Sequence, residues 1–125
     1  MSTLTLTANN FEQTILEPAE DSSGIVLVDF WASWCGPCRM FAPTYEAASK
    51  RHPDIVFGKI DTEAEQALAA AANITSIPTL MAFKEGNLVF AQPGALPSAA
   101  LEDLIGQLRA LDVRQAVAAG QGSER

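Results

Sequence analysis

The chain of 125 residues is poor in the residues on which several common functions depend. It has two cysteines and one histidine, His52, whereas a structural zinc ion takes four protein ligands. Acidic residues could complete such a site, but none has ligand spacing. Eight Lys and Arg residues stand against 15 Asp and Glu residues, for a net charge of −7. This balance argues against a nucleic-acid partner held through phosphate contacts. We therefore expect neither a metal site nor nucleic-acid binding.

Long apolar runs are also missing. No segment approaches the roughly 20 apolar residues that cross a membrane, so we expect no membrane association. The first seven residues have neither a basic region nor an apolar core, which predicts no signal peptide. Both cysteines fall in one short motif, unlike the disulfide framework of small secreted proteins. These features predict a cytoplasmic protein.

The length and a hydrophobic content of 48% are typical of one globular domain. Hydrophobic periodicity and turn residues predict α/β order, β-α-β-α-β followed by α-β-β-α, with a mixed five-stranded central sheet flanked by four helices. The expected strands are 3–7, 25–31, 55–61, 79–84 and 88–91, and the expected helices are 9–16, 35–51, 63–72 and 97–111. We assign residues 1–111 to the domain and 112–125 to a C-terminal extension, a short helix followed by a flexible tail.

The two cysteines stand where an apolar strand leads into a helix, in the stretch Phe30–Arg39. Cys35 and Cys38 are three residues apart, so their side chains share one face of the first helical turn. Unpaired N–H groups and the positive end of the helix dipole favour a thiolate there. Pro37 suits a first helical turn, and Gly36 lets a partner's backbone approach. This arrangement indicates a reversible dithiol–disulfide switch. Inert thiols or a permanent disulfide are the alternatives, although so short a loop would constrain the unfolded chain little.

The segment Trp31–Cys38 resembles the active-site segment of the thioredoxin family. The resemblance covers roughly the first 110 residues and includes Val28–Phe30, Pro43, Ser76–Thr79, Phe83–Gly86 and Gly94–Ala95. It implies the thioredoxin fold and a dithiol that reduces disulfides of protein substrates and is recharged by a flavin- and NADPH-dependent thioredoxin reductase. No bound cofactor is expected beyond the redox-active pair, and we expect a monomer.

The resemblance gives roles to individual residues. Cys35 is expected to be the exposed, nucleophilic thiol and Cys38 the thiol that resolves the mixed disulfide. Asp29 lies in an apolar strand, where burial should raise its pKa, and the family role implied for it is proton transfer to and from Cys38. A hydrogen-bonded structural acid is the alternative. Lys59 matches a family lysine near this acid, and a solvated lysine at the end of a strand is the alternative.

The resemblance further implies a cis bond before Pro78, which would place the Ile77 backbone opposite Cys35, where an extended substrate could pair with it. A flat, largely apolar surface for substrate binding is expected around the cysteines, from Trp34, Gly36, Pro37, Ile77, Pro78, Gly94 and Ala95. Trp31 is expected in the core, whereas Trp34 stands in the loop before the helix.

Three functions fit such a chain. A protein-disulfide reductase is favoured because the Gly-Pro pair between the cysteines resembles the reducing members of the family. An oxidase or isomerase on the same fold, or a binding or scaffold subunit that uses the same surface, are the alternatives.

Overall fold

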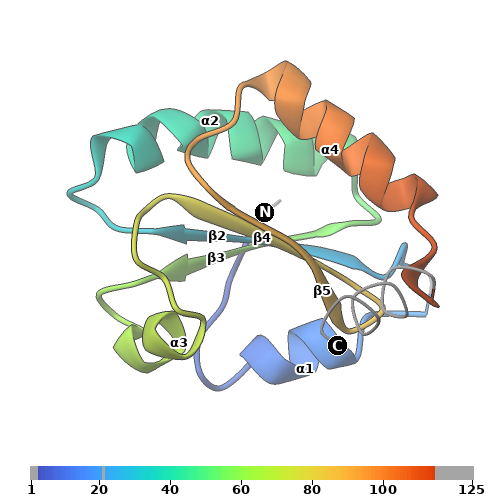
Figure 1. Ribbon diagram of the computed structural model, residues 1–125, viewed down its shortest axis with the longest axis horizontal. Helices are drawn as coiled ribbons and strands as arrows, with labels where there is room; N and C mark the ends of the chain where they lie inside the picture. Colours follow the sequence, from blue (N-terminus) through green and yellow to red (C-terminus); the bar gives the residue numbers. More distant parts are fainter. Residues whose placement is uncertain (1–2, 21, 115–125) are drawn as a thin grey trace, which may run out of the picture.

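The computed structural model describes residues 3–20 and 22–114 (Figure 1). Within this part of the chain, five strands form one sheet in the order β1-β3-β2-β4-β5. β1 and β2 run parallel to β3, whereas β4 is antiparallel to β2 and β5. The strands are β1 (Thr3–Thr5), β2 (Ile25–Trp31), β3 (Val56–Asp61), β4 (Thr79–Lys84) and β5 (Asn87–Pro93), and the helices are α1 (Phe11–Leu16), α2 (Gly36–Arg51), α3 (Gln66–Ala71) and α4 (Ser98–Ala110).

The predicted mixed sheet, with helices on both of its faces, is confirmed. α2 and α4 cover one face, and α1 and α3 lie against the other (Figure 1). Side chains of a strand alternate between the two faces, so β2 contributes to two cores. Ile25 and Leu27 pack with α2 and α4, whereas Val26 and Phe30 pack with the other core. The same alternation turns Asp29 toward α2, the helix that carries the cysteines.

Several predicted boundaries differ from the observed ones by one to three residues. β1 ends at Thr5 and not at residue 7, and β5 extends on both sides of the predicted 88–91. α3 begins at Gln66, three residues later than predicted, because a carboxylate oxygen of Asp61 accepts hydrogen bonds from the N–H groups of Glu63 and Ala64 and holds them in a turn. The predicted short helix and tail beyond Arg114 lie outside the described residues.

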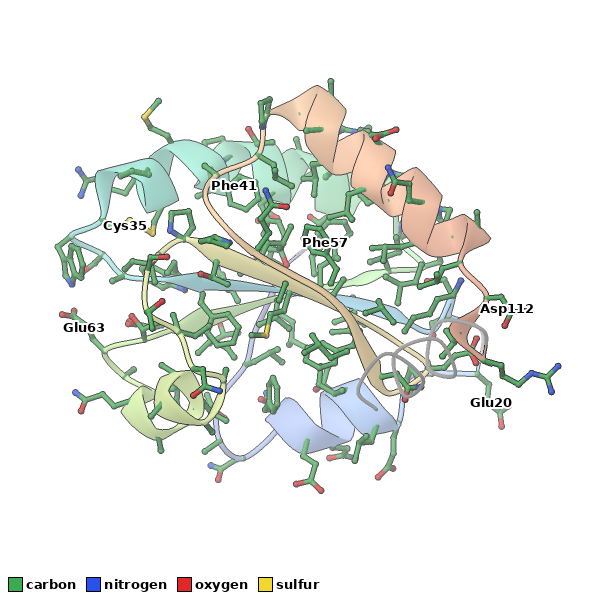
Figure 2. All side chains as sticks on the ribbon, in the orientation of Figure 1. Glu20, Cys35, Phe41, Phe57, Glu63 and Asp112 are labelled. Atoms are coloured by element: carbon green, nitrogen blue, oxygen red, sulfur yellow. A yellow bond between two sulfur atoms is a disulfide. The ribbon has the colours of Figure 1, made fainter. Side chains whose placement is uncertain are left out.

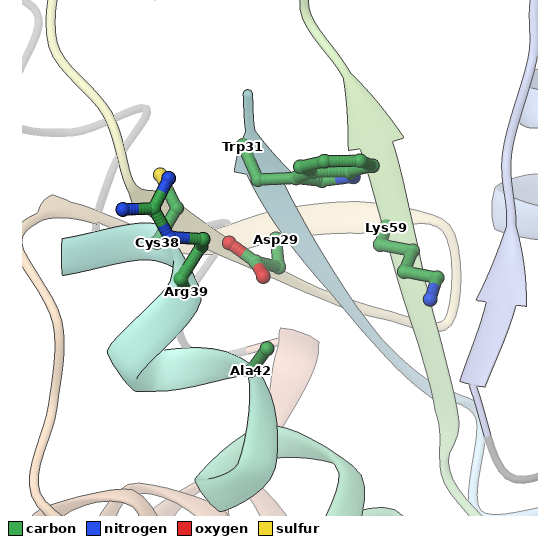
Figure 3. Close-up of a pocket in the computed structure, with 6 residues that line it drawn as sticks. All are labelled: Asp29, Trp31, Cys38, Arg39, Ala42 and Lys59. Carbon is green, nitrogen blue, oxygen red and sulfur yellow. The ribbon is translucent and has the colours of Figure 1, made fainter. Parts of the chain in front are cut away.

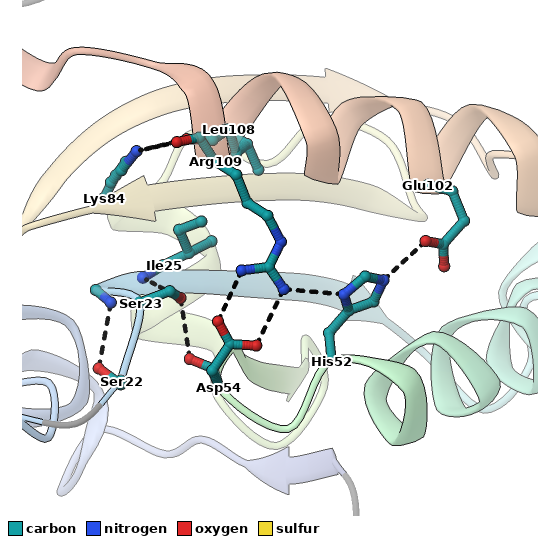
Figure 4. A network of polar contacts seen from close by, with 10 residues as sticks. Ser22, Ser23, Ile25, His52, Asp54, Lys84, Glu102, Leu108 and Arg109 are labelled. Atoms are coloured by element: carbon teal, nitrogen blue, oxygen red, sulfur yellow. Dashed lines mark hydrogen bonds and ion pairs between the residues drawn. The ribbon is translucent and has the colours of Figure 1, made fainter.

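The far end of the molecule is held by polar contacts that bind α4 to its neighbours (Figure 4). The buried amine of Lys84 donates to the carbonyl oxygens of Leu108 and Leu111, at 2.6 and 2.8 Å, and also to that of Arg109. Such a cation satisfies the carbonyl groups that a helix leaves unpaired at its C-terminus. Arg109 binds both carboxylate oxygens of Asp54. These contacts lie away from the cysteines and fix the position of α4.

Candidate active site

The two cysteines form a disulfide at the N-terminal end of α2 (Figure 2). Cys35 is the N-cap residue of the helix, and its own N–H donates to the carbonyl of Ala32 at 3.1 Å. The N–H of Cys38 points at the Cys35 sulfur, 3.2 Å away. This N–H and the helix dipole would stabilise negative charge on Cys35 once the disulfide is reduced. The geometry therefore favours Cys35 over Cys38 as the thiolate.

The prediction that Cys35 would be the exposed cysteine is wrong for this disulfide state. Cys35 is 4% exposed and Cys38 is 3% exposed. Both pack in a small apolar cluster with Ala32, and Trp31 and Ile77 lie against it. Neighbours from β2 and from the loop before β4 thus cover both sulfurs, and sequence position alone could not predict this burial.

The peptide bond between Ile77 and Pro78 is cis, as predicted. The carbonyl oxygen of Ile77 lies 3.8 Å from the Cys35 sulfur, so this backbone borders the disulfide. The carbonyl of Pro78 accepts a hydrogen bond of 2.7 Å from the N–H of Gly94, which brings the end of β5 to the same place. Gly94 has a φ of +108°, a conformation that favours glycine, and Ala95 after it is exposed. The structure thus brings Ile77, Pro78 and Gly94 together beside Cys35.

Asp29 lies behind the disulfide and is 4% exposed. Burial raises the pKa of its carboxyl from the ordinary 3.8 to about 7, and the charge of Lys59 acts in the opposite direction. Its Oδ1 atom is buried and has no hydrogen-bond partner among the described residues. A cleft of about 220 Å³ joins the acid to the active-site helix (Figure 3), lined by Asp29, Trp31, Cys38, Arg39, Ala42 and Lys59. The carboxyl group therefore shares a cleft with Cys38 and titrates near neutral pH.

Lys59 is the residue of β3 that pairs with Asp29 of β2. Its amine extends away from the carboxylate, which is directed toward the side of the cleft where Cys38 lies (Figure 3). None of the ion pairs between described residues joins Lys59 to Asp29. Lys59 therefore acts on the acid at longer range, through its charge.

The loop between β2 and α2 is held by residues that the sequence analysis did not single out. Thr62 donates to the carbonyl of Trp31 through its N–H, at 2.9 Å, and also through its hydroxyl. Arg39 donates to the carbonyl of Ser33 at 2.9 Å. Trp34 is 62% exposed, and its indole N–H donates to Glu63. The order of the strands could have indicated these contacts. β2 and β3 are parallel, so the residues that follow them meet at one edge of the sheet.

Among the described residues, no group of three or more His, Cys, Asp or Glu side chains could hold a metal ion. No helix in this part of the chain combines the length and the apolar character needed to cross a bilayer. The chemistry that the site does offer is the making and breaking of the bond between Cys35 and Cys38.

A buried strand, a helix capped by a cysteine, and a cis-proline loop beside the disulfide define the class of dithiol–disulfide exchange proteins. The family model for thioredoxin matches residues 2–107. A Streptomyces coelicolor protein provisionally named thioredoxin 2 is 57% identical over 123 residues, which cover 96% of this chain and 88% of that protein. The thioredoxin of Bacillus subtilis is 43% identical over 70% of this chain and 85% of its own length.

Solved structures agree with the sequence comparisons. A mutant thioredoxin from Halobacterium salinarum superposes with a TM-score of 0.75 and 33% identity, over 89% of this chain and 94% of that chain. Plasmodium falciparum thioredoxin superposes with a TM-score of 0.74 and 36% identity, over 84% of this chain and 98% of that chain. The chain belongs to the thioredoxin family. It is a thiol–disulfide oxidoreductase with the activity of a protein-disulfide reductase.

Proposed function

We propose that Cys35 and Cys38 carry out this reduction in two exchange steps. The Cys35 thiolate attacks one sulfur of a substrate disulfide, which forms a mixed disulfide and releases the other substrate sulfur as a thiolate. The Cys38 thiolate then attacks the Cys35 sulfur, which releases the second substrate thiolate and forms the Cys35–Cys38 disulfide. Two electrons pass from the dithiol to the substrate. The disulfide described above is the oxidised product of this cycle.

The observation that carries the proposal is the contact between the Cys35 sulfur and the N–H of Cys38, at the positive end of α2. It supports Cys35 as the nucleophile, because it stabilises charge on that sulfur. Asp29 is proposed to accept the proton of the Cys38 thiol before the second step. Its pKa of about 7 suits this exchange near neutral pH, and it lines the same cleft as Cys38.

Substrates are proposed to dock on the surface that borders the disulfide. Ile77 offers backbone groups next to Cys35, where an extended substrate segment could pair as an added strand. Exposed residues near this point are Trp34, Pro37, Gly94 and Ala95, whereas Gly36 is half-buried and Pro78 is buried. These six residues are proposed to border the docked substrate. Lys59 is proposed to tune the acid behind the disulfide.

The wider assignments follow from this chemistry. We propose that an NADPH-dependent thioredoxin reductase recharges the disulfide, and that the protein works in the cytoplasm, where thiols are kept reduced. All the proposed groups lie on one chain, which supports a monomer. The extent of the family match supports a catalytic domain at 1–111, with 112–125 as an extension.

The test is a coupled assay in which NADPH and a thioredoxin reductase sustain the reduction of insulin by the protein. Cys38→Ser should accumulate a mixed disulfide through Cys35, whereas Cys35→Ser should trap none. The reverse trapping pattern would overturn the roles of the two cysteines, and absence of turnover by folded wild type would overturn the reaction. Asp29→Asn should slow release from the mixed disulfide most above pH 7. Equal release rates at every pH would contradict proton transfer by Asp29.

A further inference from the structure

Trp34 is exposed, but its ring is anchored by a hydrogen bond. Its side chain is 62% exposed, and its ring is nevertheless held in one orientation, because the indole N–H donates to Oε2 of Glu63 at 2.8 Å. Exposed side chains ordinarily change rotamer on the picosecond to nanosecond timescale. A hydrogen bond to a carboxylate is stronger than one between neutral groups and selects one orientation of the ring.

The carboxylate that holds this ring stands on a rigid turn. The N–H of Glu63 donates to Oδ1 of Asp61 at 2.9 Å, and the N–H of Glu65 donates to the Asp61 carbonyl at the same distance. Thr62, between them, is bound to the carbonyl of Trp31 at the end of β2. Glu63 is therefore fixed relative to the loop that carries Trp34. Figure 2 shows Glu63 and Cys35 at the same end of the molecule.

The backbone of the same loop is fixed from the other side. The carbonyl of Ser33 accepts from Arg39 on α2, and the carbonyl of Ala32 accepts from the N–H of Cys35. The backbone on both sides of Trp34 is held in this way, so its side chain can still move only by rotation about its own torsion angles. The hydrogen bond to Glu63 restricts this rotation.

We propose that Glu63 is a positioning residue for substrate binding: it holds the Trp34 indole, one residue before Cys35, in the orientation that a docking substrate meets. This inference rests on the proposed docking surface. A substrate that binds to a ring already held in place does not have to immobilise that ring. The hydrogen bond therefore lowers the free-energy cost of substrate binding and does not change the rate of the exchange chemistry. Loss of Glu63 is therefore expected to raise KM and to leave kcat nearly unchanged.

The test compares Glu63→Ala with Glu63→Gln, whose amide oxygen can still accept the indole N–H, in the reduction of a disulfide peptide. We expect Glu63→Ala to raise KM about three- to fivefold, as loss of one partly exposed hydrogen bond would, with kcat within about twofold. Glu63→Gln should stay close to wild type. Glu12→Ala, which removes an exposed acid from α1, is the control for charge and should change neither constant.

Two readouts separate positioning from a merely structural role. In ¹⁵N NMR of the free protein, the Trp34 indole N–H should exchange faster with solvent in Glu63→Ala, while the Trp31 indole signal serves as the internal reference. In a Trp34→Phe background, which lacks the N–H, Glu63→Ala should raise KM no further. An unchanged KM in folded Glu63→Ala, or the same increase with and without the indole, would overturn the proposal. If the wild-type protein reduces no disulfide, the proposed function itself is wrong. If the wild-type protein is active, the outcomes above test the role of Glu63 alone.

Discussion

Replacement of Asp29 by Asn should stabilise the oxidised protein at neutral and alkaline pH. Burial raises the pKa of this carboxyl from 3.8 to about 7 in the folded state, a shift of about three units. Between these two values the folded protein holds a proton that the unfolded chain has lost. The stability of wild type therefore falls as pH rises through this window and stays lower above it. Asparagine never ionises and is free of this loss.

The size of the effect follows from the shift. Each unit is worth about 1.36 kcal/mol, so the advantage of Asp29→Asn should grow by up to about 4 kcal/mol between pH 4 and pH 8. The amide of Asn brings donors that need partners where Oδ1 of Asp29 now has none, which costs about 1 kcal/mol or more at every pH. We expect Asp29→Asn to be no more stable than wild type at pH 4 and about 2 to 3 kcal/mol more stable at pH 8.

The assay is urea unfolding of both oxidised proteins at several values of pH, so that no cysteine thiol titrates. Glu12→Gln, a change at an exposed acid, should stay within about 0.5 kcal/mol of wild type throughout. A free-energy difference between Asp29→Asn and wild type that is the same at pH 4 and pH 8 would refute the reasoning, because the carboxyl would then not be held protonated by burial.

Three further changes test contacts that stabilise the fold. Lys84→Met should destabilise the protein by about 2 to 3 kcal/mol in thermal or urea unfolding, because the carbonyls at the end of α4 lose a buried cationic donor; a change below 0.5 kcal/mol would contradict that role. Tyr45→Phe removes the buried hydroxyl that donates to the Gly58 carbonyl at 2.7 Å, and should cost about 1 to 3 kcal/mol of unfolding free energy with kcat unchanged; equal stability would show that the bond contributes nothing. Arg109→Ala breaks a half-exposed pair with Asp54 and should cost less than about 1 kcal/mol, with the loss shrinking in high salt; a larger, salt-independent loss would point to packing instead.

The sequence was most informative where the cause lies within a short segment. The apolar run of β2 accounts for its burial on both faces of the sheet, and alternation along it predicts the face to which Asp29 turns. The raised pKa of Asp29 follows from a carboxyl in that run, since desolvation is its largest cause. The sequence also predicted both cysteines at the start of α2, where the structure has Cys35 as the N-cap residue and Cys38 in the first turn. The family resemblance added the cis bond at Pro78, which local chemistry could not predict.

Contacts between distant segments were decided only by the tertiary structure. The equal burial of the two sulfurs depends on Ile77, about 40 residues further along the chain, and the capping of α4 depends on Lys84 in β4. The hydrogen bond between Trp34 and Glu63 exists because β2 and β3 end at the same edge of the sheet. The sequence by itself determined which chemistry the chain can perform, because that depends on residue types and local spacing. The tertiary structure decided which groups surround the two cysteines, because packing brings residues that are far apart in the sequence into contact.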